Sequence, residues 1–227
     1  MASIVLLLIG CPPYSNSDSQ DNSSPENSLE DVLSKTSTGN ESVSYLNQLR
    51  SQGYNVQFLL ASTAEIDSLN GHGGGGFERK GSQIKIYIND DLSETEQAHI
   101  VAHELIHIKD DFEIDQFLQT HSYIDSASED FIANHQNRGI NNFDSKVVNY
   151  VLGTLFCTEV RAYTKNQTLN DQGLTSNLFS KANQLPQFVD QNYIYRFNVS
   201  YGSSAMSMKN WCLSFNSMSS IQNQLSW

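Results

Sequence analysis

Two histidines and a glutamate in the segment QAHIVAHELIHIKDD, residues 97–111, have the types and spacing of a zinc site. His103 and His107 are four residues apart, so in a helix their imidazoles lie on one face and can bind the same ion. Glu104 is placed to take a proton from a water molecule on the open side of that ion. Zinc suits this chemistry because it lowers the pKa of bound water to about 7.

The residues around the histidines favour a helix with an apolar surface. Ser93 and Glu96 form a capping box, and no helix-breaking residue follows before about Asp110. Residues 83–89 alternate isoleucines with polar residues, which predicts a strand leading into this helix. The alternative interpretation is an ordinary helix whose histidines pack in a core without a metal.

A strand followed by a helix that contains HELIH resembles the zincin metallopeptidases over residues 82–111. In that family the strand binds an extended substrate through backbone hydrogen bonds, so the resemblance implies that residues 83–89 are a substrate-facing edge strand. It also implies a zinc-dependent peptidase, an endopeptidase rather than an exopeptidase. Lys109 departs from the longer zincin pattern, in which a hydrophobic residue is usual at that position.

A catalytic zinc ion usually has three protein ligands, and Glu159 is the favoured third. If residues 142–167 form one helix, Glu159 lies within an apolar stripe, where a carboxylate is costly unless it is paired or bound to a metal. Arg161 projects to nearly the opposite side of that helix and cannot neutralise it. TEVRAYTKN also resembles the second motif of the gluzincins, in which a glutamate on a later helix completes the site and Ala162 fills the small position.

Other acidic residues remain alternatives for the third ligand: Asp110, Asp111 and Glu113. Glu113 stands where the metzincins place a third histidine, but Asp110 replaces the glycine that turns the chain in that pattern. The two aspartates could instead orient an imidazole.

Further residues are weaker candidates. Tyr163, one helical turn after Glu159, could stabilise a transition state. The alternatives for that role are Tyr193, Tyr195 and Tyr201. The remaining histidines are not favoured as ligands: His99 lies one turn before His103, His72 is in a glycine-rich loop, and His121 and His135 are expected at the surface.

The N-terminal residues predict secretion and attachment to a lipid. Residues 4–9 are an apolar run too short to span a bilayer, which is typical of a signal peptide. Residues 8–11 resemble the bacterial lipobox, in which the cysteine, here Cys11, is lipidated, although no Lys or Arg precedes the run. Residues 12–40 have few apolar residues and are expected to form a disordered tether. These features predict a lipoprotein of the bacterial cell envelope.

The composition narrows the class of protein further. The net charge of −12 and the lack of a basic cluster disfavour nucleic acid as a partner. If Cys11 carries a lipid, Cys157 and Cys212 remain, either as a disulfide or as two buried thiols.

Residues 41–227 are expected to form an α+β domain, mostly helical in its C-terminal half. The expected strands are 54–60 and 83–89; the expected helices are 41–52, 62–70, 93–110, 112–122, 126–137, 144–167 and 174–184. The predicted function is a zinc-dependent peptidase that acts on peptides or proteins. The alternative is a non-catalytic metal-binding or interaction lipoprotein, and nothing in the sequence indicates an oligomeric state.

Overall fold

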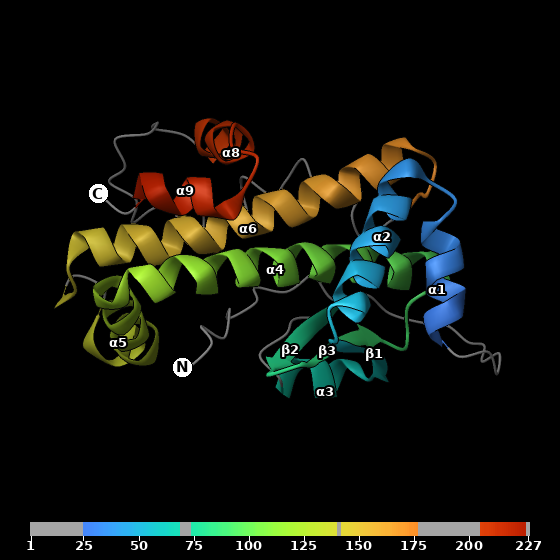
Figure 1. The fold of residues 1–227 in the computed structure, drawn as a ribbon, viewed down its shortest axis with the longest axis horizontal. Coiled ribbons are helices and arrows are strands. Elements are labelled where there is room, and N and C mark those ends of the chain that lie inside the picture. The colour runs from blue at the N-terminus through green and yellow to red at the C-terminus, as the bar shows by residue number, and fades with distance from the viewer. Residues whose placement is uncertain (1–24, 69–73, 140–141, 177–204, 226–227) are drawn as a thin grey trace. The chain divides into compact units, whose positions relative to one another are not determined.

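A computed structural model describes residues 25–68, 74–139, 142–176 and 205–225, and confirms the α+β class. A mixed sheet of three strands precedes long helices (Figure 1). The chain forms two compact units, whose boundaries fall inside α4 after Ile108 and inside α6 after Arg161. We call the unit with residues up to 108 and from 162 to 176 the sheet unit, and the unit with residues 109–161 and 205–225 the helical unit.

The sheet unit contains three strands: β1 (Asn55–Ala61), β2 (Gly75–Lys80) and β3 (Gln83–Asn89). Their order is β1-β3-β2, with β1 parallel and β2 antiparallel to β3. The expectation that residues 83–89 form an edge strand is therefore wrong, because β3 pairs on both sides. Within the described residues, β1 and β2 are the edges of the sheet.

The strand β2 has no counterpart among the expected elements because its sequence begins in a run of glycines, which are depleted in strands. At Gly75 the absence of a side chain is required by the close approach of α4. A Cβ at this position would lie 2.3 Å from Cγ2 of Ile100 in α4 and 2.6 Å from the backbone oxygen of Tyr87. The glycine thus lets the edge strand approach α4 closely, one helical turn before the HELIH histidines.

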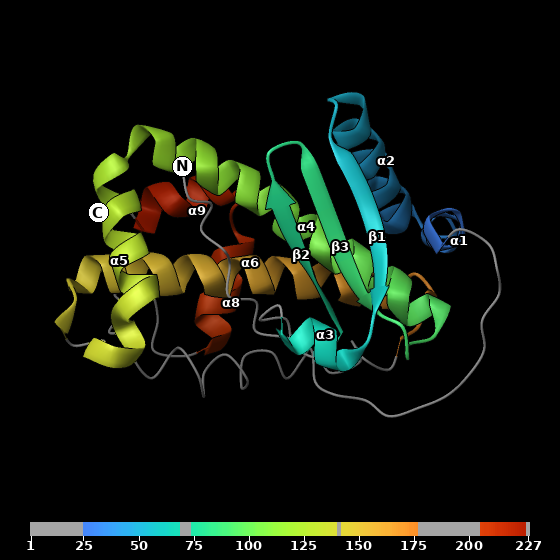
Figure 2. The same ribbon diagram turned by 90° about the horizontal axis from the view of Figure 1, so that it is seen from below.

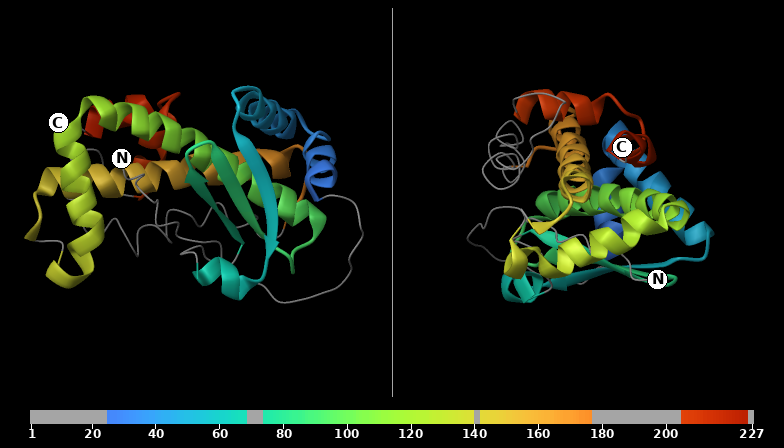
Figure 3. Two further views of the ribbon diagram at one scale, coloured as in Figure 1. Left: turned by 60° about the horizontal axis from the view of Figure 1, so that its bottom comes forward. Right: turned by 90° about the vertical axis from the view of Figure 1, so that its left-hand side faces the viewer.

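The helices of the sheet unit follow local signals in the sequence. They are α1 (Pro25–Leu33), α2 (Ser37–Ser51), α3 (Thr63–Ser68) and the first part of α4 (Glu94–Thr120). The capping boxes expected at Ser62 and Ser93 both form, since each hydroxyl bonds the glutamate three residues later. The three strands lie side by side on the same side of α4 (Figures 2 and 3).

The prediction of a disordered tether over residues 12–40 is wrong for residues 25–40. Residues 25–33 form α1, and α2 begins at Ser37 rather than near Glu41. Leu29, Val32 and Leu33 are buried, so this short apolar stripe supplies the packing that the polar composition of the segment concealed. Cys11 and the rest of the expected signal peptide lie outside the described residues.

The helical unit is built from the second part of α4, α5 (Ser122–Arg138), the first part of α6 (Ser145–Asp171), α8 (Ala205–Leu213) and α9 (Met218–Leu225). The helix expected at 112–122 is the continuation of α4. Gly153 of α6 lies against Leu225 of α9, and Gln222 of α9 hydrogen-bonds the Tyr150 hydroxyl. No helix in the described part of the chain combines the length and apolar character needed to cross a bilayer.

Replacing Gly75 by alanine tests the contact between β2 and α4. The added methyl group has no space, so we expect the free energy of unfolding to fall by about 1–3 kcal/mol, as overpacking generally causes. Urea unfolding measures this change. Lys80→Ala, at the exposed end of the same strand, is the control and should stay within about 0.5 kcal/mol of wild type. A Gly75→Ala variant as stable as wild type or more stable would refute the steric contact with Ile100, since alanine otherwise costs less than glycine in a strand.

Candidate metal centre

His103 and His107 face each other in the interior of the protein. Both lie on α4 and are at most 4% exposed, and their Nε2 atoms are 3.0 Å apart. Two nitrogen ligands at 2.0–2.1 Å from a tetrahedral zinc ion are separated by roughly 3.3 Å, so the observed spacing is close to that of a shared ion. Glu104, between them in sequence, is also buried at 4% exposure.

Glu159 of α6 lies with these histidines. One ligand atom from each of His103, His107 and Glu159 can be chosen so that all three lie within 4.8 Å of one another. All three side chains are buried, and among the described residues no other group of three or more such side chains lies close enough to hold an ion. The structure therefore contains a possible metal site made of the residues that the sequence predicts as ligands.

The contacts of its neighbours on α6 are consistent with this position of Glu159. Tyr163 and Asn166 follow it by four and seven residues, so all three share one face of the helix. The ring of Tyr163 meets the ring of His103 edge-on, with centroids 4.9 Å apart. Asn166 hydrogen-bonds the same imidazole, and both contacts lie within the sheet unit. The face of α6 that carries Glu159 is thus the face that meets His103.

The amide of Asn166 connects His103 with His99. Its Nδ2 donates to the backbone carbonyl of His99 at 2.8 Å and lies 3.1 Å from Nδ1 of the same residue. Because a carbonyl oxygen can only accept, the amide nitrogen faces His99 and Oδ1 faces His103, whose Nδ1 is 2.8 Å away. Nδ1 of His103 therefore carries the proton, and Nε2 of the neutral ring keeps the lone pair that a metal ion needs.

His99 is held as a neutral ring behind this amide. It is fully buried, and its Nε2 donates to the backbone oxygen of Leu174 at 2.7 Å. Burial lowers the pKa of His99, which favours the uncharged ring. His99 thus belongs to the surroundings of the site, as expected from its place one turn before His103, and is not part of the ligand group.

The set of donors fits a zinc ion. One imidazole presents an unprotonated Nε2, a second presents its Nε2 at 3.0 Å from the first, and a buried carboxylate lies within reach of both. Two histidines and one glutamate form a known ligand set of catalytic zinc, which leaves the fourth position open.

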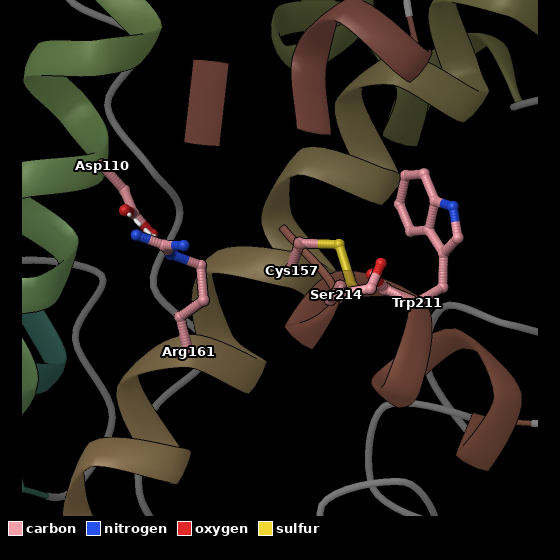
Figure 4. The surroundings of a disulfide bond; sticks show 6 residues. Asp110, Cys157, Arg161, Trp211 and Ser214 are labelled. Carbon is pink, nitrogen blue, oxygen red and sulfur yellow. Dashed lines mark hydrogen bonds and ion pairs between the residues drawn. A yellow bond between two sulfur atoms is a disulfide. The ribbon is translucent and has the colours of Figure 1, made fainter. Parts of the chain in front are cut away.

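The three alternative acidic ligands have other surroundings. Asp110 accepts two hydrogen bonds of 3.1 Å from Nε of Arg161 within the helical unit (Figure 4). Glu113 accepts from the backbone N–H of Ser219 in the first turn of α9. Asp111 is buried but is not part of the metal-binding group. The pairing with Asp110 also agrees with the prediction that Arg161 does not neutralise Glu159.

The histidines expected at the surface are half-buried instead. His121 stacks on Phe117 and bonds its backbone oxygen, and His135 does the same with Phe131. Each imidazole thus contacts the phenylalanine four residues before it in the same chain segment. His72 and the tyrosines 193, 195 and 201 lie outside the described residues.

Cys157 and Cys212 form a disulfide, which resolves the alternative that the sequence left open. The bond joins α6 to α8 within the helical unit, next to Trp211 and Ser214 (Figure 4). It stands two residues before Glu159, so the part of α6 that carries this carboxylate is covalently attached to α8.

Sequence reasoning did not identify Asn166, although a signal for it exists. The apolar stripe that places Glu159 continues through Tyr163, and the next step of three residues reaches Asn166. A polar residue on a buried face needs partners, and here the partners are two histidines of α4.

Comparisons of the chain with models of protein families, with curated proteins and with solved structures find no significant match. The geometry of the site is therefore the basis for assigning its function.

The pair formed by Asp110 and Arg161 gives a pH dependence that can be measured. Burial raises the pKa of Asp110 to about 6 from 3.8, although the neighbouring guanidinium acts to lower it. Between these two pH values the folded chain binds more protons than the unfolded chain. The contribution of Asp110 to the free energy of unfolding therefore falls as the pH rises toward about 6. We expect the free energy of unfolding of wild type, measured relative to Asp110→Asn, to fall as the pH rises from about 4 to about 6.

Urea unfolding at several pH values checks this dependence. Asp130→Asn is the control, because Asp130 forms an exposed ion pair with Arg138. The difference in free energy of unfolding between Asp130→Asn and wild type should stay constant across the pH range. If the difference between wild type and Asp110→Asn is also constant between about pH 4 and 6, the raised pKa of Asp110 is contradicted.

Proposed function

We propose that this protein is a zinc-dependent peptidase, of gluzincin type, that hydrolyses peptide bonds in peptides or proteins. The observation that carries the proposal is the buried group of His103, His107 and Glu159, whose ligand atoms lie within 4.8 Å of one another. When bound there, zinc would lower the pKa of a water molecule and polarise the carbonyl of the substrate.

Glu104 is the proposed general base. It follows His103 directly on α4 and is buried, so water competes little for its carboxylate. It would take a proton from the attacking water and deliver it to the nitrogen of the leaving amine. Tyr163 is the candidate donor to the oxyanion because its ring lies against His103.

An extended substrate would pair with β2 rather than with β3. The central strand β3 has partners on both sides, whereas β2 is an edge of the sheet among the described residues. Gly75 of β2 also lies against Ile100, within one turn of His103 on α4. A peptide added to this edge would run beside the helix that carries the site.

We further propose that the protein is tethered to the bacterial cell envelope by a lipid on Cys11. The disulfide of Cys157 and Cys212 supports this location because such bonds persist in oxidising compartments. The acidic composition gives no reason to expect nucleic acid as a partner.

The variant Glu104→Gln tests the proposed chemistry. The amide keeps the shape of the side chain but cannot take a proton, so peptide hydrolysis should fall by at least about 100-fold while zinc remains bound. Cleavage of a peptide library and metal analysis of the same sample give both values. A variant with full activity would refute the role of Glu104. Zinc bound by wild type without cleavage of any peptide would favour the non-catalytic, metal-binding alternative.

The variant Glu159→Ala tests the third ligand. We expect the zinc content to fall from about one ion per chain to near zero, since two imidazoles are fewer than the three protein ligands that catalytic zinc usually has. Glu113→Ala is the control, because Glu113 bonds the backbone of α9 and should leave the zinc content unchanged. Loss of zinc from the control alone would assign the ligand to Glu113 instead.

A further inference from the structure

Asn166 makes three contacts that together fix the direction of its amide. Its Nδ2 donates to the carbonyl oxygen of His99 and lies 3.1 Å from Nδ1 of His99, while its Oδ1 receives the Nδ1–H of His103. The side chain is fully buried, so water cannot replace any of these partners. A flipped amide would place its nitrogen against Nδ1–H of His103 and its oxygen against the carbonyl and Nδ1 of His99, and would lose all three contacts.

The direction of the amide determines the tautomer of His103. A buried neutral imidazole can carry its proton on either nitrogen, and only the Nδ1–H form leaves Nε2 available to a metal ion. The other form would direct an N–H toward Nε2 of His107. Discrimination between these two states therefore comes from Asn166, which can only accept at this position.

His99 completes the arrangement from the opposite side. Its Nε2–H donates to the backbone oxygen of Leu174, so its Nδ1 is the acceptor that faces Asn166. Donation thus runs in one direction, from His103 through Asn166 and His99 to the backbone oxygen of Leu174. All four residues belong to the sheet unit.

From this geometry we infer that Asn166 is a positioning residue, which, held by His99, keeps His103 in the Nδ1–H tautomer and so sets the affinity of the site for a divalent metal ion. This inference rests on the metal site of the proposed function, but it does not depend on whether the protein hydrolyses peptides. Residues that orient a metal-binding histidine typically change metal affinity by about 10–100-fold when they are replaced.

The first test measures the tautomer in the wild-type chain without metal. Long-range ¹H–¹⁵N correlation spectra distinguish the two neutral forms of each histidine. We expect His103 as the Nδ1–H form and His99 as the Nε2–H form. A spectrum with His103 in the Nε2–H form would overturn the inference without any variant.

The second test measures zinc affinity by competition with a chromophoric chelator. Asn166→Leu removes the acceptor, so we expect zinc to bind about 10–100-fold more weakly. Asn166→Asp keeps an acceptor toward His103 but loses the donor toward His99, so its zinc affinity should lie between those of Asn166→Leu and wild type. The control is Gln167→Leu, since within the described part of the chain the amide of Gln167 bonds Asp171 on the same helix and has no hydrogen bond to His103.

A purely structural role for Asn166 gives a different result. Asn166→Leu would then unfold at lower denaturant concentration, but its folded form would bind zinc as tightly as Gln167→Leu, and that outcome overturns the inference. If Asn166→Leu does not fold, the inference is tested by two results: the tautomer of His103 in the wild-type spectrum and the zinc affinity of Asn166→Asp. Either the Nε2–H form of His103 or an unchanged affinity of Asn166→Asp would overturn it. Zinc affinity that follows the expected order, together with no cleavage of peptides, would refute the peptidase proposal and support this inference.

Discussion

The burial of polar side chains on α4 is the constraint on which the rest of this site depends. Within about two turns this helix buries His103, His107 and Asp110, together with Glu104 and Asp111. Such groups are costly in a protein interior unless each has a partner. Helix α6 supplies partners in each unit separately: Asn166 for His103 and His99 in the sheet unit, and Arg161 for Asp110 in the helical unit. Within each unit, α6 therefore supplies polar partners for buried polar groups of α4.

The candidate metal centre is part of the same pattern. Two imidazoles and a carboxylate gathered away from water are unfavourable as a purely structural feature, and a divalent cation would offset much of that cost. The amide of Asn166 and the ion pair of Asp110 and Arg161 lie on either side of this group, and His103, His107 and Glu159 are the residues that a cation could join. The amide of Asn166, which is not one of these three residues, fixes the orientation of the His103 imidazole.

Much of this arrangement could be predicted from the sequence because its signals are local. The capping boxes at Ser62 and Ser93 define where two helices begin, and the alternation of isoleucines defines β3. The HELIH spacing places two imidazoles on one face of α4. Glu159 could be found because a carboxylate within an apolar helical stripe requires an explanation, and a helical stripe extends a local rule over several turns.

The features that escaped prediction depend on contacts between distant segments. A run of glycines does not resemble a strand, so the sequence does not predict β2. The resemblance to the zincins implies an edge strand at residues 83–89, whereas β3 is central because β1 and β2 pair with it on its two sides. The roles of Glu113 and Asp110 depend on Ser219 and Arg161, which lie 106 and 51 residues further along the chain. Asn166 belongs to the same class, because its importance appears only when its partners on α4 are known. Spacing within one helix reveals the face on which a residue lies but not what that face meets.

The disulfide between Cys157 and Cys212 has a consequence for a chain that has been cut. The two cysteines are 55 residues apart, so cleavage of any peptide bond between them leaves both fragments joined by one covalent bond. A nicked molecule would keep α8 attached to α6 and would migrate as a single chain on a denaturing gel until a reductant is added. If the backbone between the two cysteines is cleaved by a peptidase, the disulfide therefore still holds α8 to α6.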